Sequence, residues 1–194
     1  MNLITNKKSM KRNRRKFAAL MAICMAGSFA VNAQTTTVGG QEMYPKKNIV
    51  ENAVNSANHT TLVAAVKAAG LVETLKSAGP FTVFAPVNDA FENLPEGTVA
   101  ALLKKENKAT LVKVLTYHVV AGNWDFNALK SLIKKGNGTA ELTTVSGGKL
   151  WAVMNGEHNI MLKDEKGNTA NITVYDVKQS NGIIHSIDTV LLPK

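Results

Sequence analysis

The sequence predicts an α+β domain in which helices come first and antiparallel strands follow. Three observations support this class. Apolar residues recur at helical spacing in the first half, a short apolar run, "FTVFA", interrupts them at 81–85, and after residue 138 apolar runs separated by turn residues recur roughly every ten residues. Helices that precede antiparallel strands in this way pack against a sheet or a sandwich.

The helical half has recognisable start and stop residues. Thr60 or Thr61 can cap a helix that ends at Gly70. A short second helix follows and ends at Gly79-Pro80, because proline cannot continue it. Later helices are predicted to start at three further points: Thr98, Thr110 and Phe126, the last helix ending at Gly136.

The strands have a different composition. "FTVFA" is short, aromatic and β-branched, which is typical of a buried strand. Between the second and third later strands, Asn155-Gly156 is a hairpin signal, because both residues tolerate a positive φ. Five strands are predicted as a meander, at 139–145, 149–154, 158–163, 169–177 and 182–192.

Residues 1–33 have the features of a secretory signal peptide. A basic segment without acids precedes the apolar run "FAALMAICMAGSFA", and "VNA" places the predicted cleavage after Ala33. The apolar run is shorter than the roughly 20 residues that span a membrane, and no second long apolar run follows. The sequence therefore predicts an exported protein, periplasmic or secreted, whose mature chain has no transmembrane segment.

The net charge of +9 belongs mainly to this leader. Residues 1–33 hold seven of the positive charges and no acid, which leaves +2 and no arginine for residues 34–194. Nucleic-acid-binding surfaces gather Arg and Lys on one face, so we expect no nucleic-acid partner. Cys24 is the only cysteine and lies in the leader, so the mature chain is expected to lack disulfides. Residues 34–47 are polar and aperiodic, which predicts a flexible linker.

Asn88 and Asp89 follow the first predicted strand and a proline. An amide beside a carboxylate can serve hydrogen bonding or acid–base chemistry, but the same residue types also cap helix starts by accepting from backbone N–H groups. We expect the structural role. His118 lies on the apolar stripe of its helix, which predicts a buried, hydrogen-bonded histidine, whereas Tyr117 points away from the stripe and can be exposed.

The sequence has no recognisable catalytic or metal-binding pattern. Ser180, His185 and Asp188 are the residue types of a hydrolase triad, but no Gly-x-Ser-x-Gly turn surrounds the serine. His185 and Asp188 also face opposite sides of a strand. The four histidines are scattered, and neither a His-x₃-His pair nor a calcium-binding acidic loop is present. We therefore expect no enzyme activity, no metal and no cofactor.

Two long motifs resemble the signatures of the fasciclin (FAS1) domain. "FTVFAPVNDAF" at 81–91 is similar to the first, and "ITVYDVKQSNGIIHSIDTVLLP" at 172–193 is similar to the second. The segment between them, including the Tyr117-His118 pair, resembles the middle of the family. The resemblance covers a single domain, residues 48–194. It implies a FAS1-like β-sandwich or wedge with N-terminal helices packed along the sheet.

The resemblance also implies a function. Fasciclin domains are generally adhesion or interaction modules, so the expected partner is a protein or polysaccharide of the cell envelope or matrix. In animal members, integrin recognition is assigned to a Tyr-His region and an Asp-Ile pair. The matching positions here are Tyr117, His118, Asp176 and Val177. A structural polar network is expected from Asn88, Asp89, His118 and His185.

A second function remains open at this point. A few fasciclin proteins resemble pigment or lipid binders, so the chain is alternatively a carrier of a small apolar ligand. Large apolar residues of the second half are candidates to line such a pocket: Trp124, Trp151, Met154 and Met161. Ordinary core packing explains the same residues, because large apolar side chains of strands usually face the core.

Overall fold

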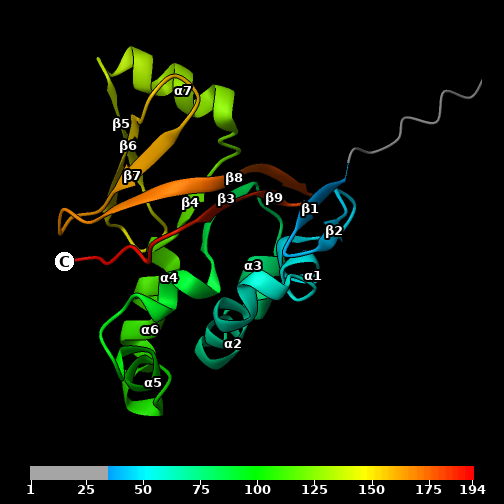
Figure 1. Cartoon of the computed structure of the whole chain (residues 1–194). Coiled ribbons are helices and arrows are strands. Elements are labelled where there is room, and N and C mark those ends of the chain that lie inside the picture. The colour runs from blue at the N-terminus through cyan, green and yellow to red at the C-terminus, as the bar shows by residue number, and fades with distance from the viewer. Residues whose placement is uncertain (1–34) are drawn as a thin grey trace, which may run out of the picture. The chain divides into compact units, whose positions relative to one another are not determined.

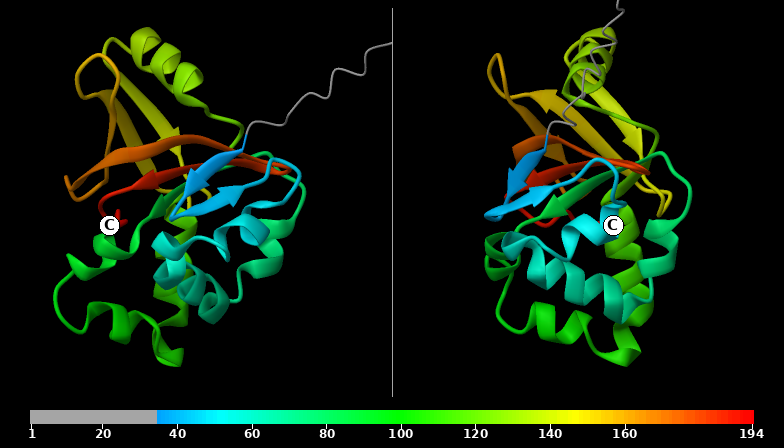
Figure 2. Two further views of the ribbon diagram at one scale, coloured as in Figure 1. Left: turned by 45° about the vertical axis from the view of Figure 1, so that its right-hand side comes forward. Right: turned by 90° about the vertical axis from the view of Figure 1, so that its right-hand side faces the viewer.

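A computed structural model describes residues 35–194, so the predicted signal peptide and its cleavage point lie outside the described residues. Within that range, no helix is both long enough and apolar enough to cross a membrane. A curved sheet occupies the middle, helices α1 to α6 gather on one side of it, and α7 lies at the other end (Figures 1 and 2). The predicted α+β class is confirmed.

Seven α-helices and nine strands lie in the described range. The helices are α1 (Ile49–Ala53), α2 (Thr60–Ala69), α3 (Val72–Lys76), α4 (Asn88–Glu92), α5 (Thr98–Leu102), α6 (Lys108–Tyr117) and α7 (Phe126–Lys135). The strands are β1 (Thr36–Val38), β2 (Gln41–Met43), β3 (Phe81–Pro86), β4 (Val119–Ala121), β5 (Thr139–Thr143), β6 (Lys149–Met154), β7 (Ile160–Lys163), β8 (Thr169–Gln179) and β9 (Gly182–Ile187).

One mixed sheet contains seven of these strands, in the order β4-β3-β9-β8-β7-β6-β5. β3 and β9 are parallel, and the other neighbouring pairs are antiparallel. The sheet curls until its edges meet, because Val120 of β4 bridges Thr144 and the Val145 N–H donates to the Val119 carbonyl at 2.7 Å. The predicted sandwich or wedge is therefore a single barrel-like sheet.

The central strands are buried on both faces and separate two cores. On one face of β3, Phe84 packs inside the curled sheet with Leu150 and residues of α7; we call this the sheet core. On the other face, Val83 and Ile184 pack with residues of α1, α2 and α6; we call this the helix core. Burial on both faces explains why these strands are nearly continuous apolar runs in the sequence.

Several helix boundaries differ from the sequence prediction. α6 begins at Lys108, two residues before Thr110, and α5 is preceded by Gly97 rather than by a threonine cap. β4 was not predicted at all, since it is only three residues long. The predicted end at Gly70 is correct, because this glycine adopts the left-handed conformation with φ 77° that commonly ends a helix.

The prediction of a flexible linker at 34–47 was wrong for its central part. β1 and β2 form an antiparallel hairpin whose inward side chains, Val38 and Met43, are buried in the helix core. The side chain of Asn52 in α1 holds Tyr44, the residue directly after β2. It accepts from the Tyr44 N–H at 3.0 Å and donates to the Tyr44 carbonyl at 2.8 Å. Strands of three residues are too short to show a period-2 pattern in the sequence.

The buried hairpin gives a first prediction. We expect Met43→Ala to lower the free energy of unfolding by about 2 to 5 kcal/mol, because it leaves a void in the helix core. Gln41→Ala, at an exposed position of the same strand, is expected to change it by less than about 0.5 kcal/mol. Urea denaturation of the mature protein measures both values. Equal, negligible effects would show that the hairpin is not part of the core.

Candidate functional site

Tyr117, the last residue of α6, is fully buried in the sheet core and is not the exposed side chain that the sequence suggested. Its hydroxyl donates to the Lys149 carbonyl at 2.6 Å and accepts from the Glu165 N–H at 3.1 Å. Burial raises the pKa of Tyr117 to about 12. Gly148 lies so close to the ring that a Cβ there would be 2.7 Å from Cε2. Tyr117 therefore joins α6 to two turns of the sheet.

His118 follows directly and is also buried. Its Nδ1–H donates to the Val114 carbonyl at 2.8 Å, and Nε2 accepts from the Leu191 N–H at 3.0 Å. Both ring nitrogens are therefore occupied, and the two bonds fix one neutral tautomer. Burial lowers the pKa of His118 to about 4, although the bond to Val114 opposes this shift. The histidine fastens the C-terminal segment to α6.

Asp176 and Val177 lie at an irregularity of β8, where the register with β9 shifts. Asp176 adopts φ 56°, a conformation that Asp tolerates better than most residues. Its carboxylate accepts from the Phe126 N–H at 2.8 Å, so it holds the start of α7. Val177 is only 1% exposed and packs in the helix core. This pair is not a surface motif.

His185 of β9 is buried, with its ring stacked on Phe84 at 5.7 Å between centroids. Nε2–H donates to the Trp124 carbonyl at 2.8 Å, and Nδ1 accepts from the Asp176 N–H at 3.3 Å. Burial lowers the pKa of His185. The residue thus joins β9 both to the bulge of β8 and to the segment before α7.

Asn88 has a structural role, but not at its own helix. Its side-chain oxygen accepts from the Thr61 N–H at 3.1 Å and from the Thr60 hydroxyl at 3.2 Å, and its amide donates to the Ala57 carbonyl at 2.8 Å. Asn88, the first residue of α4, therefore caps the start of another helix, α2. Asp89 is exposed, and its carboxylate has no hydrogen-bond partner among the described residues.

The structure therefore separates the residues that the resemblance grouped. Of the four expected binding positions, Tyr117, His118 and Val177 are buried and Asp176 supports a helix start. Instead of one polar network, the structure has three separate hydrogen-bonded groups, centred on Asn88, His118 and His185. Asp89 belongs to none of them. Among the four expected binding positions, only Asp176 is partly exposed, and its carboxylate is already bonded to the Phe126 N–H.

A cavity in the helix core was not predicted. It has a volume of about 330 Å³ and is lined by residues of α1, α2, α3, β3 and β9. Its walls are almost entirely apolar, with a floor of Val83, Ala85 and Ile184 and a side wall that includes Val38 and Met43 of the hairpin. Ligand pockets typically measure about 300 to 1,000 Å³ and have this composition.

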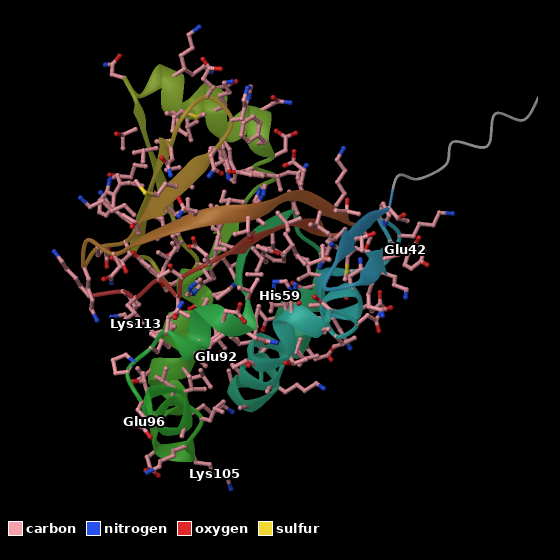
Figure 3. The ribbon with its side chains drawn as sticks, in the orientation of Figure 1. Glu42, His59, Glu92, Glu96, Lys105 and Lys113 are labelled. Atoms are coloured by element: carbon pink, nitrogen blue, oxygen red, sulfur yellow. The ribbon has the colours of Figure 1, made fainter. Side chains whose placement is uncertain are left out.

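Two of the polar side chains that line this cavity, Ser56 and His59, are bonded to each other. Ser56 Oγ and His59 Nδ1 lie 2.8 Å apart, and His59 Nε2 lies 3.3 Å from Ser186 Oγ. Burial lowers the pKa of His59, opposed by a hydrogen bond to the Ala85 carbonyl. Figure 3 labels His59 where the helices meet the central strands. The Ser-x-x-His spacing at one helical turn was the available sequence signal for this pair.

The apolar residues that the sequence suggested as pocket lining do not line this cavity. Trp124 and Met154 pack against the sheet core, and Trp151 and Met161 lie on β6 and β7, away from the cavity walls. Trp151 and Met161 alternate with the buried residues of β6 and β7, so they lie on the outer face of the sheet and in neither core. Within the described residues, no group of His, Cys, Asp or Glu is arranged to hold a metal ion.

Comparison with known proteins gives the class. The fasciclin domain family profile matches residues 57–193, and the chain belongs to this family. Protein sll1483 of Synechocystis sp. (strain ATCC 27184 / PCC 6803 / Kazusa) is 40% identical over 189 residues, which cover 91% of this chain and 97% of that protein. Cell surface glycolipoprotein MPB83 of Mycobacterium bovis is 37% identical over 123 residues, covering 63% of this chain and 48% of the relative.

A solved structure shows the same fold. The FAS1 domain pair of the insect cell adhesion molecule fasciclin I matches with a TM-score of 0.56 and 22% sequence identity. The match covers 68% of this chain and 43% of the domain pair, so the chain spans less than half of that structure. At this level of identity the likeness concerns the fold alone.

The buried tyrosine gives a second prediction. Tyr117→Phe is expected to lower the free energy of unfolding by about 1 to 3 kcal/mol, because the Glu165 N–H and the Lys149 carbonyl lose their partner inside the protein. Tyr44→Phe is the matched control, since that ring is 43% exposed. Chemical denaturation measures the difference. A loss confined to Tyr44→Phe would refute the structural role of Tyr117.

The buried histidines predict a pH dependence. His118 titrates at about 4 in the folded protein and near 6.5 when unfolded, so the unfolded state binds more protons between these values. The contribution of His118 to the free energy of unfolding is therefore fully present above pH 6.5. It falls as the pH is lowered towards 4, by on the order of 3 kcal/mol. Urea titrations across this range test the slope. His158→Gln, at an exposed histidine, should leave it unchanged, and a flat profile in the parent protein would contradict the assignment.

Proposed function

We propose that this chain is an exported, non-catalytic interaction module that binds a protein or polysaccharide at the cell envelope or in the matrix. Family membership supports the module, and two related proteins carry names that refer to the cell surface and to cell adhesion. The leader-like residues 1–33 support export to the periplasm or the exterior.

One observation carries the non-catalytic part of this proposal. Among the described residues, every buried side-chain nitrogen and oxygen has a hydrogen-bond partner within the protein. A general base needs a free nitrogen or oxygen within reach of substrate, whereas both ring nitrogens of His118 and His185 are bonded to backbone groups. The buried titratable groups therefore serve the fold.

Partner capture tests the interaction module. The mature protein, starting at Gln34, is immobilised and exposed to envelope and matrix extracts of its source, and the retained component is purified for titration. We expect Tyr117→Phe and Asp176→Asn to bind this component with unchanged affinity, because Tyr117 is fully buried and the Asp176 carboxylate is bonded to the Phe126 N–H. Failure of the immobilised protein to retain any component of either extract would contradict the interaction module, whereas loss of binding by a variant with native circular dichroism would show that its substituted residue contacts the partner.

A specific observation favours a second candidate function, the carrying of a small apolar ligand. The cavity of about 330 Å³ in the helix core has the size and the apolar walls of a ligand pocket. Native mass spectrometry and an absorption spectrum of protein purified from its own source test it. A bound small molecule that denaturation releases would support the carrier, and a bare polypeptide mass would leave the interaction module as the function.

A further inference from the structure

The cavity has an inner and an outer part that differ in chemistry. The inner walls, which include Val83, Ala85, Val177 and Ile184, are buried apolar side chains. The outer wall includes side chains that reach solvent: Val54 is 47% exposed, and Glu51, Lys67 and Lys76 are also exposed. An apolar path therefore continues from the interior of the helix core to the surface between α1, α2 and α3.

The inner part offers no partner for a charged group. The His118 ring is bonded through both nitrogens, and Ser56 and His59 are bonded to each other. Moving an ionised group away from water into such surroundings costs several kcal/mol unless it is paired. A molecule that fills the inner part must therefore be apolar there, and any charge that it carries must stay at the outer part.

The outer part carries the charges that would receive such a head group. Lys67 of α2 and Lys76 of α3 both contribute to its wall, against one acid, Glu51. Lys76 also lies 3.3 Å from Glu73, a pair in which the glutamate is well exposed to solvent. Among the described residues, no acid lies within ion-pair distance of Lys67, so this lysine can receive an anionic head group at the exposed end of the cavity.

The volume limits the length of the apolar part. An apolar cavity of 150 Å³ in another protein holds benzene, and a water-sized group occupies about 30 Å³. The cavity of about 330 Å³ thus has room for roughly eleven groups of that size. This corresponds to one chain of about ten carbons.

We propose that the cavity of the helix core binds one medium-chain carboxylate, with its apolar chain against Val83 and Ile184 and its carboxylate at the outer wall beside Lys67 and Lys76. This inference rests on the carrier function and deepens it by naming the chemical class of the ligand. It places recognition between α1, α2, α3 and the central strands, where His118 and Val177 line the inner part of the cavity and Tyr117 and Asp176 lie outside its walls.

Probe displacement tests the site itself. The mature recombinant protein is titrated with the fluorescent probe N-phenyl-1-naphthylamine, and decanoate is then added. We expect probe binding and its displacement by decanoate. Val63→Trp, on the cavity wall, is expected to weaken probe binding at least about tenfold, because the indole fills the cavity. Val145→Trp, at an exposed valine that does not line the cavity, is the matched control.

A second cavity variant keeps the test decisive if Val63→Trp fails to fold. Ala85→Leu adds volume at the floor of the cavity and is expected to weaken binding in the same direction. Absence of probe binding to the parent protein, or equal binding by Val63→Trp and Ala85→Leu variants with native circular dichroism, would overturn the site. The extract and native-mass experiments are independent of this result, so failure of the site and failure of the proposed function are distinguishable.

Neutralising the outer lysines tests the head group. We expect the double variant Lys67→Gln/Lys76→Gln to bind decanoate about three- to tenfold more weakly, because two exposed ion pairs are lost. Binding of decanol should be unchanged. Lys104→Gln/Lys105→Gln, exposed lysines that lie outside the cavity walls, is the control of equal charge. An equal loss for decanoate and decanol, or an equal loss in the control, would overturn the placement of the carboxylate.

Discussion

The parallel pairing of β3 with β9 is the constraint on which the rest of the domain depends. It joins segments about one hundred residues apart, from Phe81 opposite Gly182 to Pro86 opposite Ile187. A side chain at Gly182 would overlap the Phe81 backbone, so the close approach at the start of the pair requires glycine. Because both strands are buried on both faces, this pair forms a wall of the sheet core and the floor of the cavity in the helix core.

Polar side chains then attach the other elements to this pair. Asn88, directly after β3, caps α2, and His185 of β9 bonds to the segment before α7. His118, after α6, holds the backbone of Leu191 beyond β9. Each of these bonds satisfies a backbone group at a buried or partly buried position. Leaving a buried group without a partner costs about 1 to 3 kcal/mol. Asn88, His118 and His185 therefore hold the architecture together.

The sequence predicts this architecture well where the pattern is local. Apolar period, turn residues and glycines were sufficient for α2, α7 and the meander from β5 to β9. The parallel pairing, the closure of the sheet and the three-residue strands depend on contacts between distant segments, which no local pattern contains. For the same reason, Tyr117 seemed free to face solvent, although it bonds to Lys149 and Glu165 in another part of the chain. The cavity depends on how completely side chains fill a space, so residue types alone did not indicate it.

The central claim is that the cavity of the helix core binds a small molecule, whereas the sheet core serves packing. Methyl-labelled mature protein, observed by NMR during a titration with decanoate, tests it most directly. The account predicts shifts for methyl groups of the cavity, such as Val83 and Ile184, while those of Leu150 and Ile160 in the sheet core stay in place. Shifts of equal size in both cores, or no shift in the helix core, would contradict it.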